Sequence, residues 1–208
     1  MQLWEPGDVG SLEISDFLFT VQGPTAGAVL VEWNVHQSSQ GNAAMWDCHF
    51  RVGGAIGSHL QLADCPKLSG SINSNCKAAS MLMHVTKSAS GYFENVWAWT
   101  ADHDIDQPPS GNDTGDAQID IYSARGILVE SQGPVWLYGT ASEHNAFYQY
   151  QFSQASNIYS GHMQTETPTG SLSLMHLAFS RLEPLLMIQR FRTAARILLA
   201  SMHGRRES

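Results

Sequence analysis

The fold is decided by residues 94–100, Glu94-Asn95-Val96-Trp97-Ala98-Trp99-Thr100, where an asparagine interrupts a strand-like run and more apolar residues follow. The same arrangement recurs at three other places: Asp16-Phe17-Leu18-Phe19, Asp47-Cys48-His49-Phe50 and Asn157-Ile158-Tyr159-Ser160. The spacings between the four anchors are 31, 48 and 62 residues. They fit one, two and two to three coils of a parallel β-helix with loop insertions, because each coil must bury its inward side chains on its neighbours.

Short strand-like runs, separated by turn residues, fill the chain between residues 10 and 165. No sustained helical period occurs before residue 170. A β-sandwich is the alternative, but the two-residue hairpin turns Asn-Gly and Asp-Gly are absent between the runs. We therefore predict an all-β fold, a partial right-handed parallel β-helix. Its strands are expected at 12–20, 27–35, 44–52, 79–86, 92–100, 119–122, 126–131, 135–138, 146–152 and 157–164.

Charged residues make up 14% of the 208 residues, and the net charge of −8 is divided unevenly along the chain. Residues 1–168 carry 17 acidic and five basic side chains, whereas residues 169–208 carry six arginines and two glutamates. The acidic first part argues against a nucleic-acid partner, because a phosphate-binding surface needs clustered Lys and Arg. A neutral, polar ligand fits this composition better.

The chain shows no membrane or targeting segment. No apolar run approaches the roughly 20 residues that span a bilayer. Residues 1–8 have neither the basic region nor the apolar region of a secretory signal. Of the three cysteines, Cys65 and Cys76 flank a Gly/Ser/Asn loop and are placed to close a small disulfide ring, whereas Cys48 is expected to be a buried thiol. No Cys/His spacing resembles a zinc site, so no metal is predicted.

Three segments interrupt the strand pattern. Residues 63–77 and 103–117 are polar loops, of the kind that commonly form the walls of a binding site. Residues 169–208 form a basic tail, and within it 180–201 has an amphipathic helical pattern. This helix would either bind a membrane surface or a partner, or cover an open end of the β-helix.

Residues 126–168 hold the densest group of candidate catalytic side chains. Glu143 and Glu166 are 23 residues apart, close to one coil, so equivalent positions on stacked coils would lie about 4.8 Å apart. An inverting glycosidase needs two carboxyl groups about 6.5–9.5 Å apart, which splayed side chains reach. The alternative is that both glutamates are solvated surface side chains. Glu130 alternates with apolar neighbours and is interpreted as structural.

The aromatic and acidic residues near 100 have two interpretations. Trp97 and Trp99 lie on the same side of a strand, and such a pair is more often core than a sugar platform. Asp102-His103-Asp104 follows and is either a set of partners for sugar hydroxyls or a solvated surface. The sequence has no Gly-x-Ser-x-Gly elbow and no phosphate-binding Gly-rich loop with Lys-Ser/Thr.

Several unusual runs resemble fungal exo-β-1,3-glucanases of glycoside hydrolase family 55 over about residues 3–168. The runs are Glu13-Ile14-Ser15-Asp16-Phe17, Gly23-Pro24-Thr25-Ala26-Gly27-Ala28, Phe50-Arg51-Val52-Gly53-Gly54, the stretch from Glu94 to Asp104, Gly133-Pro134-Val135-Trp136-Leu137-Tyr138-Gly139-Thr140-Ala141-Ser142-Glu143-His144, and Gln164-Thr165-Glu166-Thr167-Pro168. The resemblance implies two tandem right-handed parallel β-helices with the active site between them. It also implies inverting hydrolysis of β-1,3-glucan, a laminarin-like polysaccharide, from its non-reducing end, without cofactor or metal and outside the cell.

The resemblance assigns roles by motif. Glu166, in Gln-Thr-Glu-Thr-Pro, matches the general acid, and Glu143, in Ala-Ser-Glu-His, matches a glutamate that helps hold the attacking water. Trp99 matches a sugar-stacking aromatic residue and Asp102 a partner of a sugar hydroxyl. Two further residues of the same motifs, His144 and Gln164, are expected to bind substrate.

The chain also departs from the family pattern. It resembles only part of the second β-helix, and Thr169 stands where the family motif continues with a tyrosine. We therefore expect residues 1–168 to be a partial β-helix, and hypothesise that 169–208 is a frame-shifted reading. A truncated hydrolase is one expectation. The competing one is a non-catalytic glucan-binding module or an inactive fragment.

Overall fold

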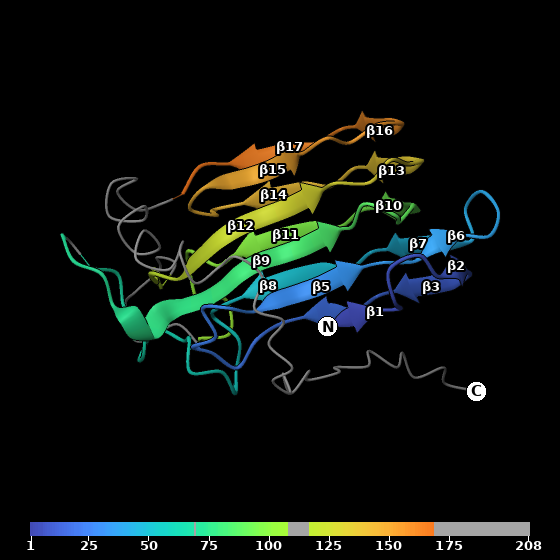
Figure 1. Cartoon of the computed structure of the whole chain (residues 1–208). Coiled ribbons are helices and arrows are strands. Elements are labelled where there is room, and N and C mark those ends of the chain that lie inside the picture. Colours follow the sequence, from blue (N-terminus) through green and yellow to red (C-terminus); the bar gives the residue numbers. More distant parts are fainter. Residues whose placement is uncertain (69, 108–116, 169–208) are drawn as a thin grey trace, which may run out of the picture.

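The computed structural model describes residues 1–68, 70–107 and 117–168, and these form a parallel β-helix (Figure 1). Each of five stacked coils contributes one strand to each of three five-stranded sheets, and every strand pairing in these sheets is parallel. The predicted all-β, β-helical fold is therefore confirmed, and the β-sandwich alternative, which pairs strands in antiparallel hairpins, is excluded. The amphipathic helix predicted in the tail lies outside the described residues.

Each of the three sheets takes one strand from every coil, in chain order. The first sheet contains β1 (Gln2–Leu3), β5 (Val29–Trp33), β9 (Lys77–Val85), β12 (Tyr122–Val129) and β15 (Tyr148–Phe152). The second sheet contains β3 (Leu12–Ser15), β7 (Ala43–Trp46), β10 (Gly91–Glu94), β13 (Val135–Tyr138) and β16 (Ile158–Gly161). The third sheet contains β4 (Leu18–Phe19), β8 (His49–Val52), β11 (Trp97–Thr100), β14 (Ala141–Glu143) and β17 (Gln164–Glu166). A small sheet pairs β2 (Val9–Gly10) with β6 (His36–Gln37), and a 3₁₀ turn, η1, covers Ser74–Cys76.

Several predicted single strands are bent into two. The runs 12–20, 44–52 and 92–100 each cross a corner between the second and third sheets, because a residue in left-handed backbone turns the chain there. That corner residue is Asp16, Asp47 and Asn95 in three successive coils, with φ of 57°, 51° and 52°. Three of the four predicted anchors thus occupy equivalent positions. The 48 residues from Asp47 to Asn95 span one coil and not the predicted two, because the excursion after β8 lies between them.

The fourth predicted anchor, Asn157, is wrong. It precedes β16, in register with the residue before β13, and so belongs to a different corner. The corner positions of the last two coils are held by Gly139 and His162, with φ of 56° and 54°. Glycine adopts left-handed backbone without cost and histidine is among the residues tolerated there, so an Asp/Asn pattern misses both.

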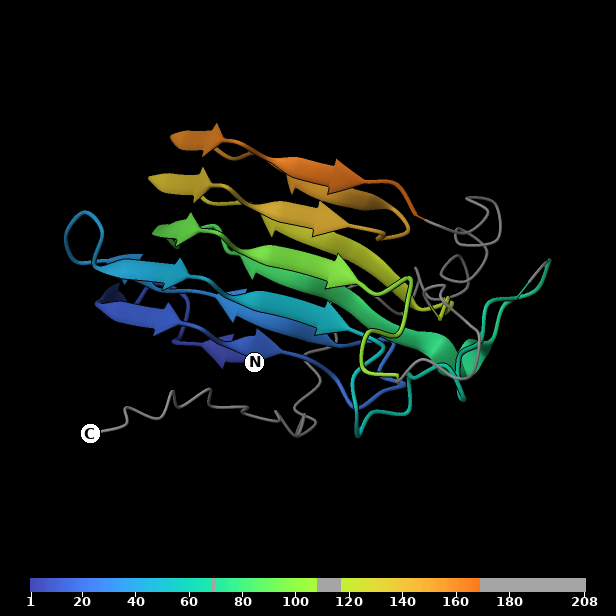
Figure 2. The same cartoon turned by 180° about the vertical axis from the view of Figure 1, so that it is seen from behind.

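Hydrogen bonds join the corners of successive coils into a column. The backbone N–H of Asp47 donates to Glu94 O at 3.1 Å, and that of Asn95 donates to Tyr138 O at 2.9 Å. The Asn95 amide also donates to the Asp47 carboxylate. Figure 2 shows the result from behind, with the coils rising in parallel layers from blue to orange. The corner therefore fixes the register in which the third sheet stacks.

Aromatic and aliphatic side chains fill the space between the three sheets. Phe50 stacks on Phe19 with ring centroids 4.9 Å apart, and Trp33 meets Phe93 edge-on at 5.0 Å. The Trp33 indole N–H donates to Ser90 O, so its polar atom is satisfied inside the core.

No helix in the described residues is long and apolar enough to cross a membrane.

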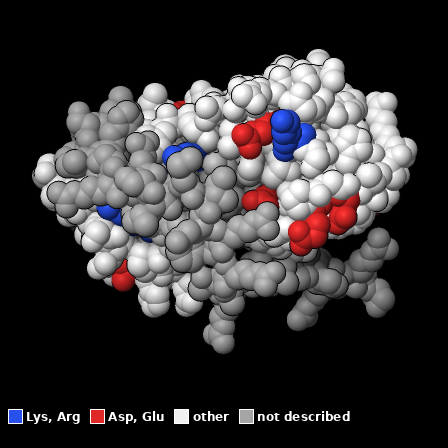
Figure 3. All heavy atoms as spheres, in the orientation of Figure 1, with Lys and Arg blue, Asp and Glu red and all other residues white. Residues whose placement is uncertain are grey.

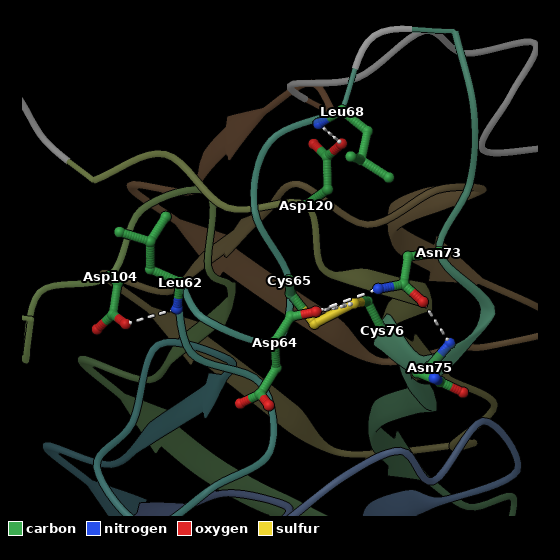
Figure 4. The surroundings of a disulfide bond; sticks show 9 residues. All are labelled: Leu62, Asp64, Cys65, Leu68, Asn73, Asn75, Cys76, Asp104 and Asp120. Atoms are coloured by element: carbon green, nitrogen blue, oxygen red, sulfur yellow. Dashed lines mark hydrogen bonds between the residues drawn. A yellow bond between two sulfur atoms is a disulfide. The ribbon is translucent and has the colours of Figure 1, made fainter.

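Two long excursions leave the third sheet, one after β8 and one after β11. The first carries the two cysteines singled out by the sequence, and the structure joins Cys65 to Cys76 in a disulfide (Figure 4). The second excursion is tied to the first by Asp104, which accepts the Leu62 N–H at 2.9 Å. Cys48 is a buried free thiol whose pKa is raised by burial.

We predict that Asn95→Ala lowers the free energy of unfolding by about 1–2 kcal/mol, because alanine resists left-handed backbone and cannot bond to Asp47. Asn95→Gly is the matched control. It loses the same hydrogen bond but relieves the backbone, so it should lose less stability. Urea denaturation of the two variants checks this, and equal unfolding midpoints for Asn95→Ala and the wild type would contradict it.

Candidate functional site

The outward face of the third sheet brings the predicted site residues together. Arg51, Trp99, Glu143 and Glu166 stand at one register position on β8, β11, β14 and β17. The residues that alternate with them, such as Phe50, Ala98 and Ser142, are fully buried and point into the core. The 23-residue spacing of the two glutamates is therefore one coil.

Glu143 is a buried carboxylate held by two donors. Its Oε2 accepts the Trp97 indole N–H at 2.9 Å, and its Oε1 accepts the Gln164 amide at 2.8 Å. Both partners lie two residues earlier on the neighbouring strands, across the small side chain of Ala141. Glu143 is 5% exposed. Since both carboxyl oxygens act as acceptors, the arrangement suits the ionised form.

Glu166 meets a different partner. Its Oε2 lies 3.1 Å from Nε2 of His144, the residue directly after β14. The His144 Nδ1 lies 3.1 Å from the carbonyl oxygen of Thr100, at the end of β11. The Glu166 side chain is 55% exposed, whereas that of His144 is 7% exposed. A buried imidazole therefore orients a solvent-accessible carboxyl group.

The two carboxyl groups turn in opposite directions along the strands. Glu143 points back toward Trp97 and Gln164, at the start of β11 and β17. Glu166 points forward to His144, beyond the end of β14. Backbones in adjacent strands lie about 4.8 Å apart, and this divergence widens the separation of the carboxyl groups.

The tryptophan pair packs beside the carboxylates. Trp97 and Trp99 stack with centroids 5.0 Å apart, and His103 closes the outer side of Trp99 at 5.2 Å. Trp99 is 2% exposed and Trp97 is partly buried, so Trp97 offers the larger accessible surface. The sugar-stacking role of Trp99 stays a prediction.

Polar side chains from the second excursion border the same end of the site. Asp102 lies 2.8 Å from His103 Nδ1 and 3.8 Å from His144 Nδ1. Arg51, on β8, forms an ion pair with Asp106 at 3.1 Å, which fixes the segment after Asp102 against the third sheet. Glu130, interpreted as structural, pairs with His84 at 2.8 Å away from this face.

A buried network missed by the sequence reasoning supports the turn after Glu143. Asn145 accepts the Thr100 hydroxyl at 3.1 Å and donates to Gln149 at 2.8 Å and to the Glu143 carbonyl at 3.1 Å. Gly126 leaves room for this network, because a Cβ at that position would lie 2.2 Å from the Ser142 hydroxyl oxygen and 3.0 Å from the Asn145 amide nitrogen. Asn145 stands directly after the Ala-Ser-Glu-His motif, but nothing in the local sequence marks it as buried.

No metal site is present in this part of the molecule. Within residues 1–68, 70–107 and 117–168, no three His, Cys, Asp or Glu side chains gather as metal ligands. Figure 3 shows acidic and basic side chains scattered over the described surface in that view, without an extended basic patch.

The fold and the site define the class: a parallel β-helix with paired carboxylates on one outward face. The chain is 62% identical over 168 residues to "Non-secreted LysM effector LysM15" of Penicillium expansum, covering 81% of this chain and 12% of that protein. It is 48% identical over 171 residues to "Probable glucan endo-1,3-beta-glucosidase" of Arthroderma benhamiae, covering 81% and 19%. It is 43% identical over 169 residues to "Glucan 1,3-beta-glucosidase" of Cochliobolus carbonum, covering 81% and 20%.

The comparisons place the chain among relatives of glucan hydrolases. No family model matches the sequence. The chain spans a fifth or less of the length of each of these three relatives. Two of the three carry glucan 1,3-β-glucosidase names, so the β-helix is related to proteins named for glucan hydrolysis.

We predict that Gly126→Ala lowers the free energy of unfolding by about 1–3 kcal/mol, because the new methyl group displaces Ser142, Gln149 and Asn145. Gly161→Ala is the matched control on β16 of the second sheet, where the nearest atoms belong to the side chain of Tyr159 at 3.2 Å or more. Thermal or urea unfolding measures both. Equal losses in the two variants would show that the Asn145 network does not constrain position 126.

Proposed function

We propose that this β-helix is the carboxylate-bearing part of a family-55-like glucan hydrolase that cleaves β-1,3-glucan with inversion and from the chain end. The observation that carries the proposal is the pairing of Glu143 with Glu166 on adjacent coils in different proton environments. Catalysis of this kind needs one carboxyl group that donates a proton and one that remains ionised.

Glu166 is the proposed general acid. It is the more exposed of the two glutamates, so a glycosidic oxygen has access to it. Its Oε2 lies 3.1 Å from Nε2 of His144, which gives the carboxyl group a partner with which it can share a proton. The resemblance of Gln164-Thr165-Glu166-Thr167-Pro168 to the family motif supports the same role.

Glu143 is proposed to hold the attacking water. Each of its oxygens accepts one donor and keeps a further lone pair for a water O–H. In the reaction, the water oxygen bonds to the anomeric carbon as the bond to the leaving oxygen breaks. That oxygen takes the Glu166 proton, and a water proton passes toward Glu143 and on to solvent. Gln164 and Trp97 position Glu143 in this scheme, and Asp102 and Trp99 are proposed to contact the sugar.

We predict that Glu166→Gln lowers kcat/KM for laminarin by about 100-fold or more, because an amide keeps the shape but cannot donate a catalytic proton. Glucose release by the full 208-residue chain measures this. Glu130→Gln is the matched control, since it alters a carboxylate–histidine pair outside the site. Absence of wild-type activity, or equal activity of Glu166→Gln, would refute the enzyme proposal. Release of α-glucose alone would support inversion and exo cleavage.

A glucan-binding module is the second candidate function, and an aromatic face favours it. The outward side of the second sheet carries a stripe of aromatic residues at register positions of successive coils: Trp46, Tyr92, Trp136, Tyr138 and Tyr159. Tyr138 stacks on Tyr92 at 6.2 Å and on Tyr159 at 5.3 Å. Tyr138 and Tyr159 are 39% and 49% exposed, and contiguous exposed apolar patches commonly mark binding surfaces. Their hydroxyls give the apolar stripe a polar margin suited to a sugar.

We predict that the double variant Tyr138→Ala/Tyr159→Ala binds laminarin roughly tenfold more weakly if this face is a glucan platform. Affinity electrophoresis in laminarin gels measures the binding. Phe152→Ala, which removes an equally exposed aromatic ring from the first sheet, is the control. Unchanged retardation of the double variant would remove the platform hypothesis, and loss of retardation in Glu166→Gln instead would locate binding at the carboxylates.

A further inference from the structure

The His144 imidazole is bonded at both of its nitrogen atoms. Nδ1 lies 3.1 Å from the carbonyl oxygen of Thr100, and Nε2 lies 3.1 Å from Oε2 of Glu166. A carbonyl oxygen can only accept a hydrogen bond, so Nδ1 carries a hydrogen. This assignment fixes the tautomer of the neutral ring, because its other nitrogen then has only a lone pair.

The lone pair on Nε2 cannot face an ionised carboxylate oxygen at hydrogen-bond distance without a proton between them. Either the ring is an imidazolium that donates to the carboxylate, or Glu166 is a carboxylic acid that donates to Nε2. In both cases the pair holds one proton beyond the one on Nδ1. Glu143 differs, because its two partners are donors that carry their own hydrogens.

We propose that His144 and Glu166 share this proton. His144 is then a positioning residue that retains the proton beside the carboxyl group of Glu166. The proposal rests on the proposed role of Glu166 as the general acid. When Glu166 gives its proton to the leaving oxygen, the carboxylate remains against Nε2, and a proton from solvent restores the pair.

The surroundings hold the ring in this orientation. His144 has left-handed backbone with φ of 63°, and its N–H donates to Glu166 O at 3.2 Å, which ties the residue to β17. The described titratable groups that face the ring are Asp102, whose Oδ1 is 3.8 Å from Nδ1, and Glu166. Asp102 also supports the hydrogen on Nδ1, because a carboxylate at that side favours a donor. Glu143 precedes His144 but turns toward Trp97.

Nitrogen-15 NMR of histidine-labelled protein tests the pair without an activity assay. We expect His144 to show the Nδ1–H tautomer when neutral. At the same pH, the Nε2 resonance of the wild type should show the second proton and that of Glu166→Gln should show a bare lone pair, because the neutral amide can itself donate to Nε2. His84 provides the matched control, since Glu130→Gln should move the ring nitrogen resonances of His84 and leave those of His144 unchanged.

The outcomes separate this proposal from the proposed function. A neutral ring in the Nε2–H tautomer, or an Nε2 resonance that is the same in the wild type and in Glu166→Gln, overturns the shared proton even if glucan hydrolysis depends on Glu166. If the proton is shared but the rate of glucan hydrolysis is the same in the wild type and in Glu166→Gln, the His144–Glu166 proposal stands and the role of Glu166 as general acid is refuted. A change of the Nε2 resonance in Glu166→Gln at an unaltered urea unfolding midpoint is a signature that a merely structural contact does not produce.

Discussion

The structure depends on the one-to-one stacking of each coil on the next at the corner between the second and third sheets. There a residue in left-handed backbone donates its N–H to the coil beside it, as Asp47 does to Glu94 and Asn95 does to Tyr138. Side chains alternate between the two faces of a strand, so a slip of one residue would turn the outward set into the core. The corner therefore decides that Trp99, Glu143 and Glu166 share one face.

This constraint explains which parts of the fold the sequence could predict. Asp16, Asp47 and Asn95 are visible because acidic and amide side chains suit left-handed backbone. Gly139 and His162 occupy the same position without that chemical signature, so an Asp/Asn pattern points instead to Asn157, which belongs to another corner. Coil length gave little help, since loops after β8 and β11 lengthen some coils and leave others short.

The candidate site, too, has features that the sequence could predict and features that it could not. The one-coil spacing of Glu143 and Glu166 could be inferred from chain positions alone, and the structure has them in register. The hydrogen-bond partners of the two glutamates could not be inferred from chain positions, because each partner comes from a neighbouring coil. Trp97 and Gln164 bond to Glu143, and His144 contacts Glu166. The supporting contacts of Asn145 and the space at Gly126 are properties of packing between coils and have no local pattern.

Two chemically identical side chains in one column, Glu143 and Glu166, thus have different hydrogen-bond partners and different exposure. Glu143 is buried among N–H donors that stabilise its negative charge. Glu166 lies on β17, the last strand of the third sheet in the described part of the chain, and β14 is its neighbour there. A carboxyl group at such an edge would be mobile if its backbone pairing alone held it, but the buried imidazole of His144 fixes its direction. The precision of the site on its exposed side therefore comes from a buried residue one coil below.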